Sequence, residues 1–422
     1  MRKRVLILGA DGFIGRHIAF EFRAAGWQVL ACARRIRALK HMGFETLQAD
    51  LSRAETHDPS FWGEHICGAV INAAGLLNAT EAVFEAVHIK APEAVYRAMP
   101  DARKLLISAV GIDTPDTGFA RWRRQGEILA RTHNAICLRP GLVLGDTSYG
   151  GSSLLRALAS LPLTPLPGGG NQVMNPVHAA DLAHVVREIM EDPSDFATGP
   201  HDIGGPETVT QAQMISGYRG WLGLAPCRNF TLPARLAALV GKIGDFMRLG
   251  PISSTALSQL ETGVLADNVT LATQLDNKPR GFTDFVNARP AGTQDLWQAR
   301  LYLLRPLLRI ALIFMWVLSG LIGLFLPPET FLPMLDGTFF PDWALITTAR
   351  LGGIADLGIA WALLRGWRLK LMGIVQISLV GGYTIGLSLL APALWVLPVG
   401  GLLKNLPILL LLVIFLILEE ER

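Results

Sequence analysis

The sequence contains few cysteines and almost no net charge, and both shortages exclude classes of protein. Its four cysteines in 422 residues form no Cys-x-x-Cys pair, so neither a zinc site nor a redox-active disulfide is indicated, and we predict no metal. Unpaired thiols suit a reducing cytoplasm. The 38 basic and 35 acidic residues leave a net charge of +3, which is too small to predict a nucleic-acid partner.

Charged residues are scarcest in the last part of the chain. Residues 302–422 hold only eight Lys or Arg and seven Asp or Glu. A helix that crosses a bilayer needs about 20 apolar residues. Four segments have this character: Pro306–Leu326, Trp343–Leu364, Leu369–Leu390 and Val396–Leu418. We therefore predict an all-α bundle of four transmembrane helices over residues 302–422, with three spans and a re-entrant segment as the alternative.

A glycine-rich turn lies near the start of the chain, between a predicted strand and a predicted helix. Val5–Leu8 is a continuous apolar run, typical of a strand buried on both faces, and Gln28–Ala33 has the same character. The glycines between them permit close approach of a pyrophosphate, and the helix N-terminus presents free N–H groups to it. The residues of this turn that we expect to contact a nucleotide cofactor are Gly9, Asp11, Gly12, Phe13, Ile14 and Gly15.

Strands and helices continue to alternate after this unit. The further predicted strands are Thr46–Leu51, Gly68–Gly75, Lys104–Ser108 and Ala135–Pro140, with helical stretches between them. Such alternation is typical of α/β proteins with a parallel sheet. We predict a Rossmann-like, doubly wound parallel sheet within residues 1–290 and a linker at residues 291–301.

Two arginines follow the second predicted strand and bear on the choice of cofactor. A carboxylate at this place accepts the ribose hydroxyls of NAD, whereas this chain has Arg34 and Arg35. Guanidinium groups pair well with a 2′-phosphate, so NADP(H) is favoured over NAD(H), and a solvated basic surface is the alternative. We place Asp50 and Leu51, which end the third predicted strand, beside the adenine.

The sequence resembles the extended and atypical short-chain dehydrogenase/reductases over residues 3–290. The motifs that carry the resemblance are Gly9-x-x-Gly12-x-x-Gly15, Ala49-Asp50-Leu51, Asn72-Ala73-Ala74-Gly75, Leu138-Arg139-Pro140-Gly141, Asn175-Pro176-Val177-His178-x-x-Asp181 and His201–Glu207. It is most similar to the branch that contains the NADPH-binding accessory subunit of respiratory complex I. The resemblance implies cofactor contacts at Ala73, Ala74, Gly75, Arg123, Pro140 and Val143.

The catalytic signature of that family is only partly present. The family uses a serine and a Tyr-x-x-x-Lys pair, in which the tyrosine transfers a proton and the lysine lowers the pKa of the tyrosine. Ser108 stands at the serine position, but Phe119 replaces the tyrosine and Arg123 replaces the lysine. Phenylalanine cannot transfer a proton, and arginine hardly deprotonates. The usual proton relay is therefore absent, while Arg123 can still contact a cofactor.

Three residues of the Pro-Val-His segment have the spacing of a metal site. His178, Asp181 and His184 are three apart and can share a helix face, but their place in the family segment favours a structural role. His88, where relatives often carry asparagine, is interpreted as a packing or hydrogen-bonding residue. The amphipathic stretch Leu232–Leu249 has two interpretations: a helix on a membrane surface, or a helix that covers the substrate cleft.

Basic residues predict the orientation of the membrane part. Arg300 and Arg305 precede the first predicted span and Arg309 lies in its first turn, while Arg365, Arg368 and Lys370 lie at the connection between the second and third. The connections that follow the first and third spans have no basic residue. The positive-inside rule therefore places both termini in the cytoplasm, and we expect a multi-pass protein of the inner (cytoplasmic) membrane with its Rossmann domain in the cytoplasm.

Arg350, Asp356 and Lys404 are charged residues that lie inside the predicted spans, away from the basic residues at the span ends. Charges at membrane depth are costly, so we expect these residues to face the bundle interior and pair. They either lock the helices together or line a pocket for a quinone or another amphiphile. This part resembles the DoxX-like four-helix membrane family, through Pro398-x-x-Gly401-x-x-Lys404-Asn405.

Two functions are compatible with these features. One is a membrane-anchored NADP(H)-dependent reductase of a lipid-like carbonyl, an isoprenoid or a quinone, with Ser108 polarising the substrate. The other is a non-catalytic NADP(H)-holding subunit or assembly factor of a larger respiratory or photosynthetic membrane complex. The loss of the Tyr–Lys pair favours the second, and the glycine turn fits both.

Overall fold

The computed structural model describes residues 3–113, 117–147, 149–193, 196–262, 264–267, 269–396 and 400–420. The chain forms two compact units. The first comprises Met1–Lys242 and Pro251–Ala299, and the second comprises Ile243–Gly250 and Arg300–Arg422.

The segment expected to be a linker, residues 291–301, is mostly helical. Helix α14 begins at Thr293 and continues to Phe325. Asp295 stabilises the first turn of this helix, since its carboxylate accepts a 2.9 Å hydrogen bond from the backbone N–H of Gly292. An acidic residue in this position is also favoured by the helix dipole. Helical structure therefore starts well before the apolar run that marked the boundary in the sequence.

A parallel sheet forms the centre of the first unit, which confirms the predicted fold class. Its strand order is β11-β6-β5-β4-β1-β2-β3, and every neighbouring pair is parallel. The strands are β1 (Arg4–Leu8), β2 (Gln28–Ala33), β3 (Glu45–Gln48), β4 (Ala69–Asn72), β5 (Arg103–Ile107), β6 (Ile136–Pro140) and β11 (Gly199–Ile203). Strand β11 is not among the predicted strands, because its sequence Gly-Pro-His-Asp-Ile has no apolar run.

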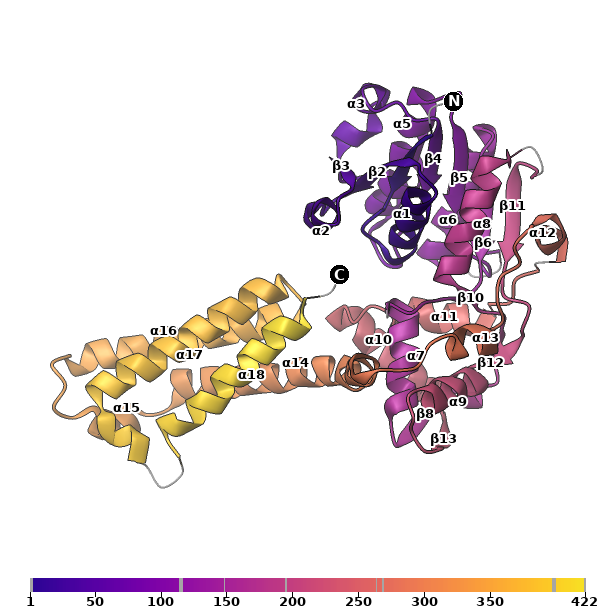
Figure 1. The fold of residues 1–422 in the computed structure, drawn as a ribbon. Helices are drawn as coiled ribbons and strands as arrows, with labels where there is room; N and C mark the ends of the chain where they lie inside the picture. The colour runs from indigo at the N-terminus through magenta and orange to yellow at the C-terminus, as the bar shows by residue number, and fades with distance from the viewer. Residues whose placement is uncertain are drawn as a thin grey trace. The chain divides into compact units, whose positions relative to one another are not determined.

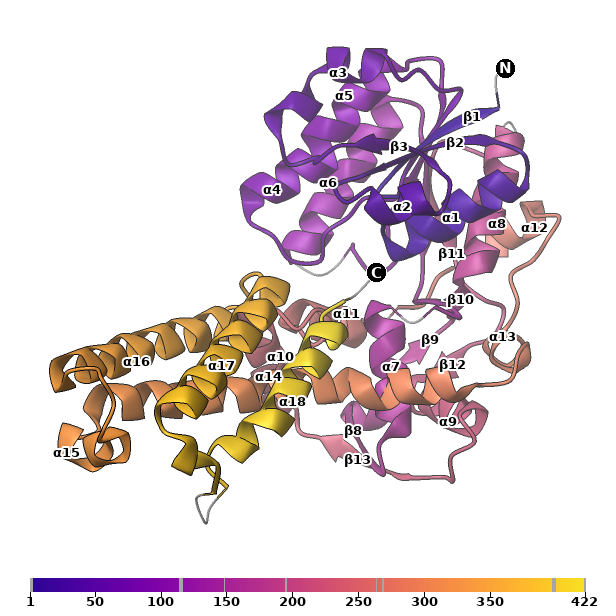
Figure 2. The same ribbon diagram turned by 60° about the vertical axis from the view of Figure 1, so that its left-hand side comes forward.

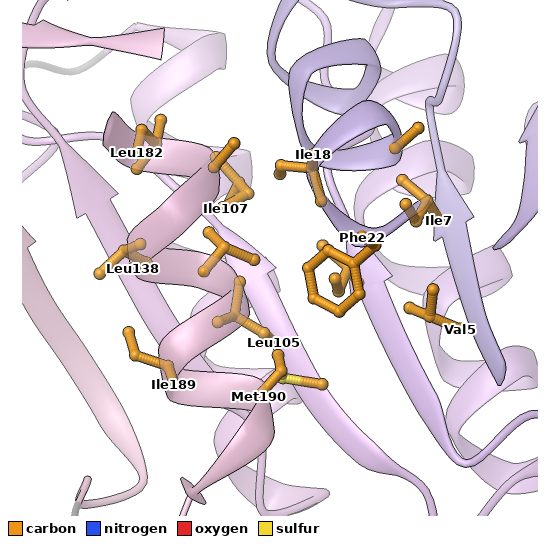
Figure 3. Close-up of a cluster of buried hydrophobic side chains, with 14 of the residues drawn as sticks. Val5, Ile7, Ile18, Phe22, Leu105, Ile107, Leu138, Leu182, Ile189 and Met190 are labelled. Carbon is orange, nitrogen blue, oxygen red and sulfur yellow. The ribbon is translucent and has the colours of Figure 1, made fainter. Parts of the chain in front are cut away.

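Helices cover both faces of this sheet, as Figure 2 shows. Helices α1 (Phe13–Ala24) and α8 (Ala179–Glu191) lie together on one face. Figure 3 shows Phe22 of α1 and Met190 of α8 in one buried cluster with the strand residue Leu105. The other face carries α3 (Pro59–Gly63), α5 (Ala91–Ala98) and α6 (Gly118–Thr132). Burial of both faces explains the near-continuous apolar sequence of the central strands.

The rest of the first unit is built from short strands and helices. Strands β7, β8 and β9 pair with β10, β13 and β12, respectively. These and the remaining named elements are α2 (Arg37–His41), α4 (Glu81–Glu85), β7 (Val143–Leu144), α7 (Gly150–Ser160), β8 (Leu163–Pro167), β9 (Val173–Met174), β10 (Val177–His178), β12 (Val209–Thr210), α9 (Gln211–Trp221), β13 (Arg228–Leu232), α10 (Ala234–Met247), α11 (Ser254–Thr262), α12 (Val269–Gln274) and α13 (Phe282–Asn287). Helix α10 continues into the second unit.

Four long helices form the second unit and lie side by side in Figure 1. They are α14, α16 (Asp342–Leu364), α17 (Leu369–Leu390) and α18 (Asn405–Leu418), with the short α15 (Pro328–Phe331) after α14. The interior holds Gln376, which is fully buried and accepts a 2.7 Å hydrogen bond from the indole of Trp316. Large apolar side chains point outward, for example Phe314 and Leu389, which are 65% and 79% exposed. Bulky apolar groups outside and satisfied polar groups inside suit a bundle surrounded by lipid.

The structure shortens the fourth predicted span. Helix α18 begins at Asn405, after a 3-10 turn at Leu402–Lys404, whereas the apolar run predicted a start at Val396. Val396 instead ends a separate 3-10 turn, Pro392–Val396, and Pro398 of the DoxX-like motif lies outside the described residues. Among those residues, two helices are long and apolar enough to cross a membrane, Thr293–Phe325 and Leu369–Leu390, and Leu402–Leu418 is a shorter apolar helix.

The charged residues of the predicted spans do not pair as expected. Arg350 donates 2.9 Å hydrogen bonds to the carbonyls of Gly323 and Leu326 at the end of α14. The buried Asp356 accepts a 2.6 Å bond from the Ser319 hydroxyl, and Lys404 is exposed. Helix-end carbonyls that have no intrahelical partner satisfy the guanidinium, so Arg350 needs no carboxylate.

Candidate cofactor site

In the glycine turn between β1 and α1, side chains at Gly9 and Gly15 would clash with neighbouring backbone atoms. Gly9 has φ +76°, and a Cβ atom there would lie 2.8 Å from Cα of Ala74. A Cβ atom at Gly15 would overlap the carbonyl of Gly9. Gly12 caps α1 without any side-chain bond to the first turn. The N–H groups of Gly9 and Ala10 bond the carbonyl of Cys32, and that of Gly12 bonds the carbonyl of Gly9. The N–H groups of Phe13 and Ile14 belong to the first turn of α1, where no intrahelical acceptor exists, so they can bind an anion.

The predicted cofactor residues follow the carboxyl ends of neighbouring parallel strands. Gly9–Gly15 follows β1, Arg34 and Arg35 follow β2, and Ala73–Gly75 follows β4. Pro140 ends β6, and Val143 begins β7. Since parallel strands end at one edge of a sheet, these residues share the edge at which α/β proteins bind ligands.

Arg34 and Arg35 are exposed at this edge, near two carboxylates. The guanidinium of Arg35 lies 3.9 Å from the carboxylate of Asp11, and 82% of its side chain is exposed. Burial alone would raise the pKa of Asp50, but hydrogen bonds from Ser52 and the charge of Arg34 lower it overall. Both arginines are thus available to an anionic ligand, because exposed ion pairs of this kind are weak.

Asp50 and Leu51 lie after β3 and not within it, in contrast to the predicted strand Thr46–Leu51. Strand β3 ends at Gln48. The carboxylate of Asp50 accepts hydrogen bonds from the backbone N–H and the hydroxyl of Ser52, at 3.1 and 2.7 Å. An Asx turn of this type competes with strand pairing, so the chain leaves the sheet here.

Ser108 follows β5 with its hydroxyl unsatisfied. The residue is 4% exposed, and its Oγ atom has no hydrogen-bond partner in the described part of the chain. Its backbone N–H donates a 2.7 Å bond to the carbonyl of Leu138 and fixes the position of the residue. A buried hydroxyl without a partner is unfavourable in an unliganded protein. A ligand that accepts or donates a hydrogen bond at this point would satisfy it.

The side chain of Arg123, on α6, is bound to the end of β5 at Ile107, the residue before Ser108. Its guanidinium donates a 2.5 Å hydrogen bond to the carbonyl of Ile107, and its Cζ atom lies 5.5 Å from the ring centroid of Phe119. Burial lowers the pKa of Arg123 to about 10, so the group stays protonated at neutral pH. The replacements inferred from the sequence therefore give a fixed cation beside an aromatic ring, with no phenol.

His88 is a buried neutral neighbour of this cation. It lies in a π-helical turn, Ala86–Lys90, and its Nε2 atom is buried without a partner among the described residues. Burial, followed by the positive charge of Arg123, lowers the pKa of His88 to about 3. The sequence indicated packing or hydrogen bonding for His88, and the structure supports packing.

A buried ion pair that the sequence analysis did not identify fixes α6 to the sheet. Arg139 of β6 donates to both carboxylate oxygens of Glu127, at 2.8 and 2.6 Å, and Glu127 is 3% exposed. Arg139 also bonds Asp113 at 3.0 Å. Glu127 lies one turn after Arg123, so this pair positions the cation. The Glu127–Arg139 spacing alone gives no signal, because the two residues lie on different elements.

His178, Asp181 and His184 do not converge. The imidazole of His178 accepts a 3.2 Å bond from the N–H of Ala180 and caps α8. Asp181 forms an ion pair with Arg280, at 2.8 Å, and His184 contacts Glu21 at 3.1 Å. These partners give all three residues the structural role that the sequence favoured.

Fold and site together define a Rossmann-like domain with a glycine turn suited to a dinucleotide, followed by a domain of apolar helices. Residues 5–98 match the model of the NAD dependent epimerase/dehydratase family, and residues 313–413 match that of the DoxX-like family. The chain therefore joins a region similar to the NAD dependent epimerase/dehydratase family to a C-terminal region similar to the DoxX-like family.

Curated relatives include reductases. A dTDP-4-dehydro-6-deoxy-D-allose reductase from a Streptomyces species is 28% identical over 299 residues, which cover 58% of this chain and 91% of the relative. A ceramide reductase from Caulobacter vibrioides is 27% identical over 188 residues, which cover 42% of this chain and 58% of the relative.

The fold is shared with solved epimerases. The UDP-glucuronic acid 4-epimerase from Bacillus cereus, in complex with NAD, aligns with a TM-score of 0.53 and 15% identity, over 71% of this chain and 97% of the epimerase. The residues present fit a pyridine nucleotide: the glycine turn leaves room for phosphates, and the Ser108 hydroxyl lacks a partner. The similarity to the complex I accessory subunit stays a prediction.

Proposed function

We propose that this protein is a membrane-anchored, NADP(H)-dependent reductase that acts on a lipid-like carbonyl, isoprenoid or quinone substrate. The observation that carries the proposal is the buried, unpartnered hydroxyl of Ser108 at the carboxyl end of β5, within a cofactor site whose glycine turn is intact. The DoxX-like anchor supports a substrate that resides in the membrane, and one curated relative is named for the lipid ceramide.

Arg34 and Arg35 support NADP(H) as the cofactor. Both side chains are exposed after β2, where an acidic residue would favour NAD. A 2′-phosphate would form charge-assisted hydrogen bonds with them. Asp11, 3.9 Å from Arg35, is the nearest competing anion.

Ser108 and Arg123 would have separate roles in a carbonyl reduction. A bound nicotinamide dinucleotide supplies the hydride, which reduces the carbonyl carbon while the carbonyl oxygen gains a proton. The Ser108 hydroxyl donates a hydrogen bond to that oxygen and stabilises its developing negative charge. The fixed cation of Arg123 adds to this stabilisation. Phe119 has no ionisable proton to donate, so in this proposal water protonates the carbonyl oxygen.

A second candidate function is a non-catalytic NADP(H)-holding subunit or assembly factor of a larger membrane complex. It is favoured by the replacement of the proton-donating tyrosine by Phe119 and by the hydrogen bond that ties Arg123 to Ile107. These residues would then serve to hold the cofactor and keep the fold rigid.

The deciding experiment measures NADPH consumption by the full chain in its native lipids, with added lipid and quinone extracts. A reductase requires sustained, substrate-dependent oxidation that falls at least about 100-fold in Ser108→Ala. Removing an unsatisfied buried hydroxyl should leave stability nearly unchanged, so this loss would not reflect unfolding. Ser160→Ala is the matched control, since that hydroxyl already bonds the carbonyl of Ala157. Retained NADPH without turnover, together with co-purification of a larger complex, would favour the second candidate.

A further inference from the structure

Helix α10 exposes a continuous apolar stripe. The side chains of Leu236, Leu239, Val240, Ile243 and Phe246 are each 46–52% exposed. Their spacing of three and four residues places them along one side of the helix. Ala237, about 100° from Leu236 around the helix, is 5% exposed, and Met247, at the C-terminal end of the helix, is 4% exposed. A soluble protein rarely leaves such a stripe uncovered.

Basic residues border the stripe. At 100° per residue, Arg235 and Lys242 fall on one edge of it, and both are exposed. The side away from the stripe is the packed one: a Cβ atom at Gly241 would lie 3.1 Å from the backbone nitrogen of Ser254, at the start of α11. An apolar stripe with a cationic edge is the pattern of a helix that lies in the interface of an anionic bilayer.

The C-terminal end of α10 is tied to the basic connection of the membrane unit. The buried Arg309 donates to the carbonyl of Met247 at 2.9 Å, and also to the carbonyls of Leu363 and Leu364 at the end of α16, at 2.6 and 3.1 Å. The Cζ atom of Arg365 lies 4.8 Å from the ring centroid of Phe246. All of these residues belong to the second unit.

This connection has the composition of a membrane–water interface. It contains Arg365, Trp367, Arg368 and Lys370, and Trp367 is 46% exposed. Tryptophan and basic residues gather at the headgroup level of membrane proteins. The end of α10 therefore sits at the depth where an interfacial helix would lie.

We infer that α10 is an interfacial membrane helix, which inserts its Leu236–Phe246 stripe into the headgroup–acyl boundary of the bilayer that holds the C-terminal bundle. The occupant of the stripe is lipid, with anionic headgroups at the Arg235 and Lys242 edge. Within the first unit, α11 packs on α10, and its Thr255 hydroxyl lies 3.1 Å from Oδ1 of Asn78, just after the Ala73–Gly75 segment. Helix α11 therefore contacts both α10 and the chain that follows the Ala73–Gly75 segment.

Spin labels on the full chain in nanodiscs of phosphatidylcholine and phosphatidylglycerol test this inference. Labels are placed at Leu239→Cys and Ile243→Cys, with Ala238→Cys as the matched control, in a Cys227→Ser background. Cys32, Cys67 and Cys137 are buried. Ala238 is exposed but lies one residue, about 100°, away from the stripe. Collision rates with oxygen report lipid, and those with a water-soluble nickel chelate report water.

We expect the oxygen-to-nickel ratio at Leu239 and Ile243 to exceed that at Ala238 by at least about five-fold. Replacing Arg235 and Lys242 with glutamine should lower the ratio at Leu239 in anionic nanodiscs and leave it unchanged in purely zwitterionic ones. Equal, high nickel accessibility at all three labels would overturn the inference. Protection of the stripe from both reagents would also overturn it, by indicating a second copy or a protein partner. The result does not depend on turnover, so it is independent of the proposed reductase.

Discussion

The guanidinium of Arg123 occupies the space beside Gly75 into which any side chain at that position would extend. The same guanidinium bonds the carbonyl of Ile107. Arg123 therefore connects the end of β5 with the segment that follows β4, the two places where a cofactor and a substrate would meet. A lysine in its place would keep the charge but would lose the planar fork that makes this contact.

Gly75→Ala should destabilise the first unit, because the added methyl group overlaps a buried guanidinium. Overpacking of this kind costs about 1–3 kcal/mol. The double variant Gly75→Ala/Arg123→Ala should be less destabilised than the sum of the single changes, by at least about 0.5 kcal/mol. Pulse proteolysis in urea, on the full chain in detergent, measures these free energies. Strict additivity would show that the two residues do not share this space.

Arg34→Ala should weaken NADPH binding selectively. A charge-assisted hydrogen bond is worth about 1.5–3 kcal/mol, and the exposure of Arg34 reduces this, so we expect a loss of roughly ten-fold. Affinity for NADH should stay within two-fold, since it lacks the 2′-phosphate. Fluorescence titration with NADPH and NADH measures both affinities in the parent protein and the variant. Equal affinity of the parent protein for NADH and NADPH would disprove the preference.

The buried His88 should make the first unit less stable in mild acid. Its pKa is about 3 in the folded chain and near 6.5 when unfolded. The unfolded state therefore binds a proton first as the pH falls, and stability decreases from about pH 6.5 downward. From about pH 7.5 to about pH 5 the loss is roughly 2 kcal/mol.

His88→Asn provides the comparison for this pH effect. Asparagine does not titrate, so the variant should lose about 2 kcal/mol less than the parent between the same two pH values. The other histidines contribute equally to both proteins and cancel. Identical pH profiles of unfolding would mean that His88 is protonated in the folded state.

The topology is testable with a reporter that functions only in the cytoplasm. A fusion after Arg422 should be active, and an insertion near Gly337 should be silent. The first and last helices of the bundle have their outer ends on the same side, since Arg305 of α14 bonds Glu419, just after α18, at 2.9 Å. A reversed pattern would place the connection with Arg365 and Arg368 outside and contradict the positive-inside argument.

The double change Phe119→Tyr/Arg123→Lys should not raise the rate of NADPH oxidation. It puts a phenol and an ammonium one turn apart, but the lysine cannot reproduce the contacts of Arg123 with Ile107 and Gly75. A displacement of about 1 Å can cost roughly 100-fold in rate, so turnover should fall while NADPH affinity changes only a few-fold. Steady-state NADPH oxidation tests this. A gain in turnover would show that a proton donor at position 119 limits the reaction.

The doubly wound fold, the glycine turn and the apolar helices could be predicted from the amino-acid sequence, because each depends on a local pattern. Continuous apolar strands, glycines at a turn and long apolar runs each have a short-range physical cause. The loss of a phenol at Phe119 also followed from the sequence, since no packing can restore a missing hydroxyl.

Contacts between side chains on different elements could be seen only in the folded chain. The Arg139–Glu127 pair, the contact of Arg123 with Gly75 and the tie from Arg309 to Met247 join residues on separate elements, whose approach no spacing encodes. Arg350 bonds carbonyls at the end of α14, which have no intrahelical partner, while Asp356 bonds Ser319. Polar strand β11 joins the sheet through backbone pairing with β6, which needs no apolar side chains.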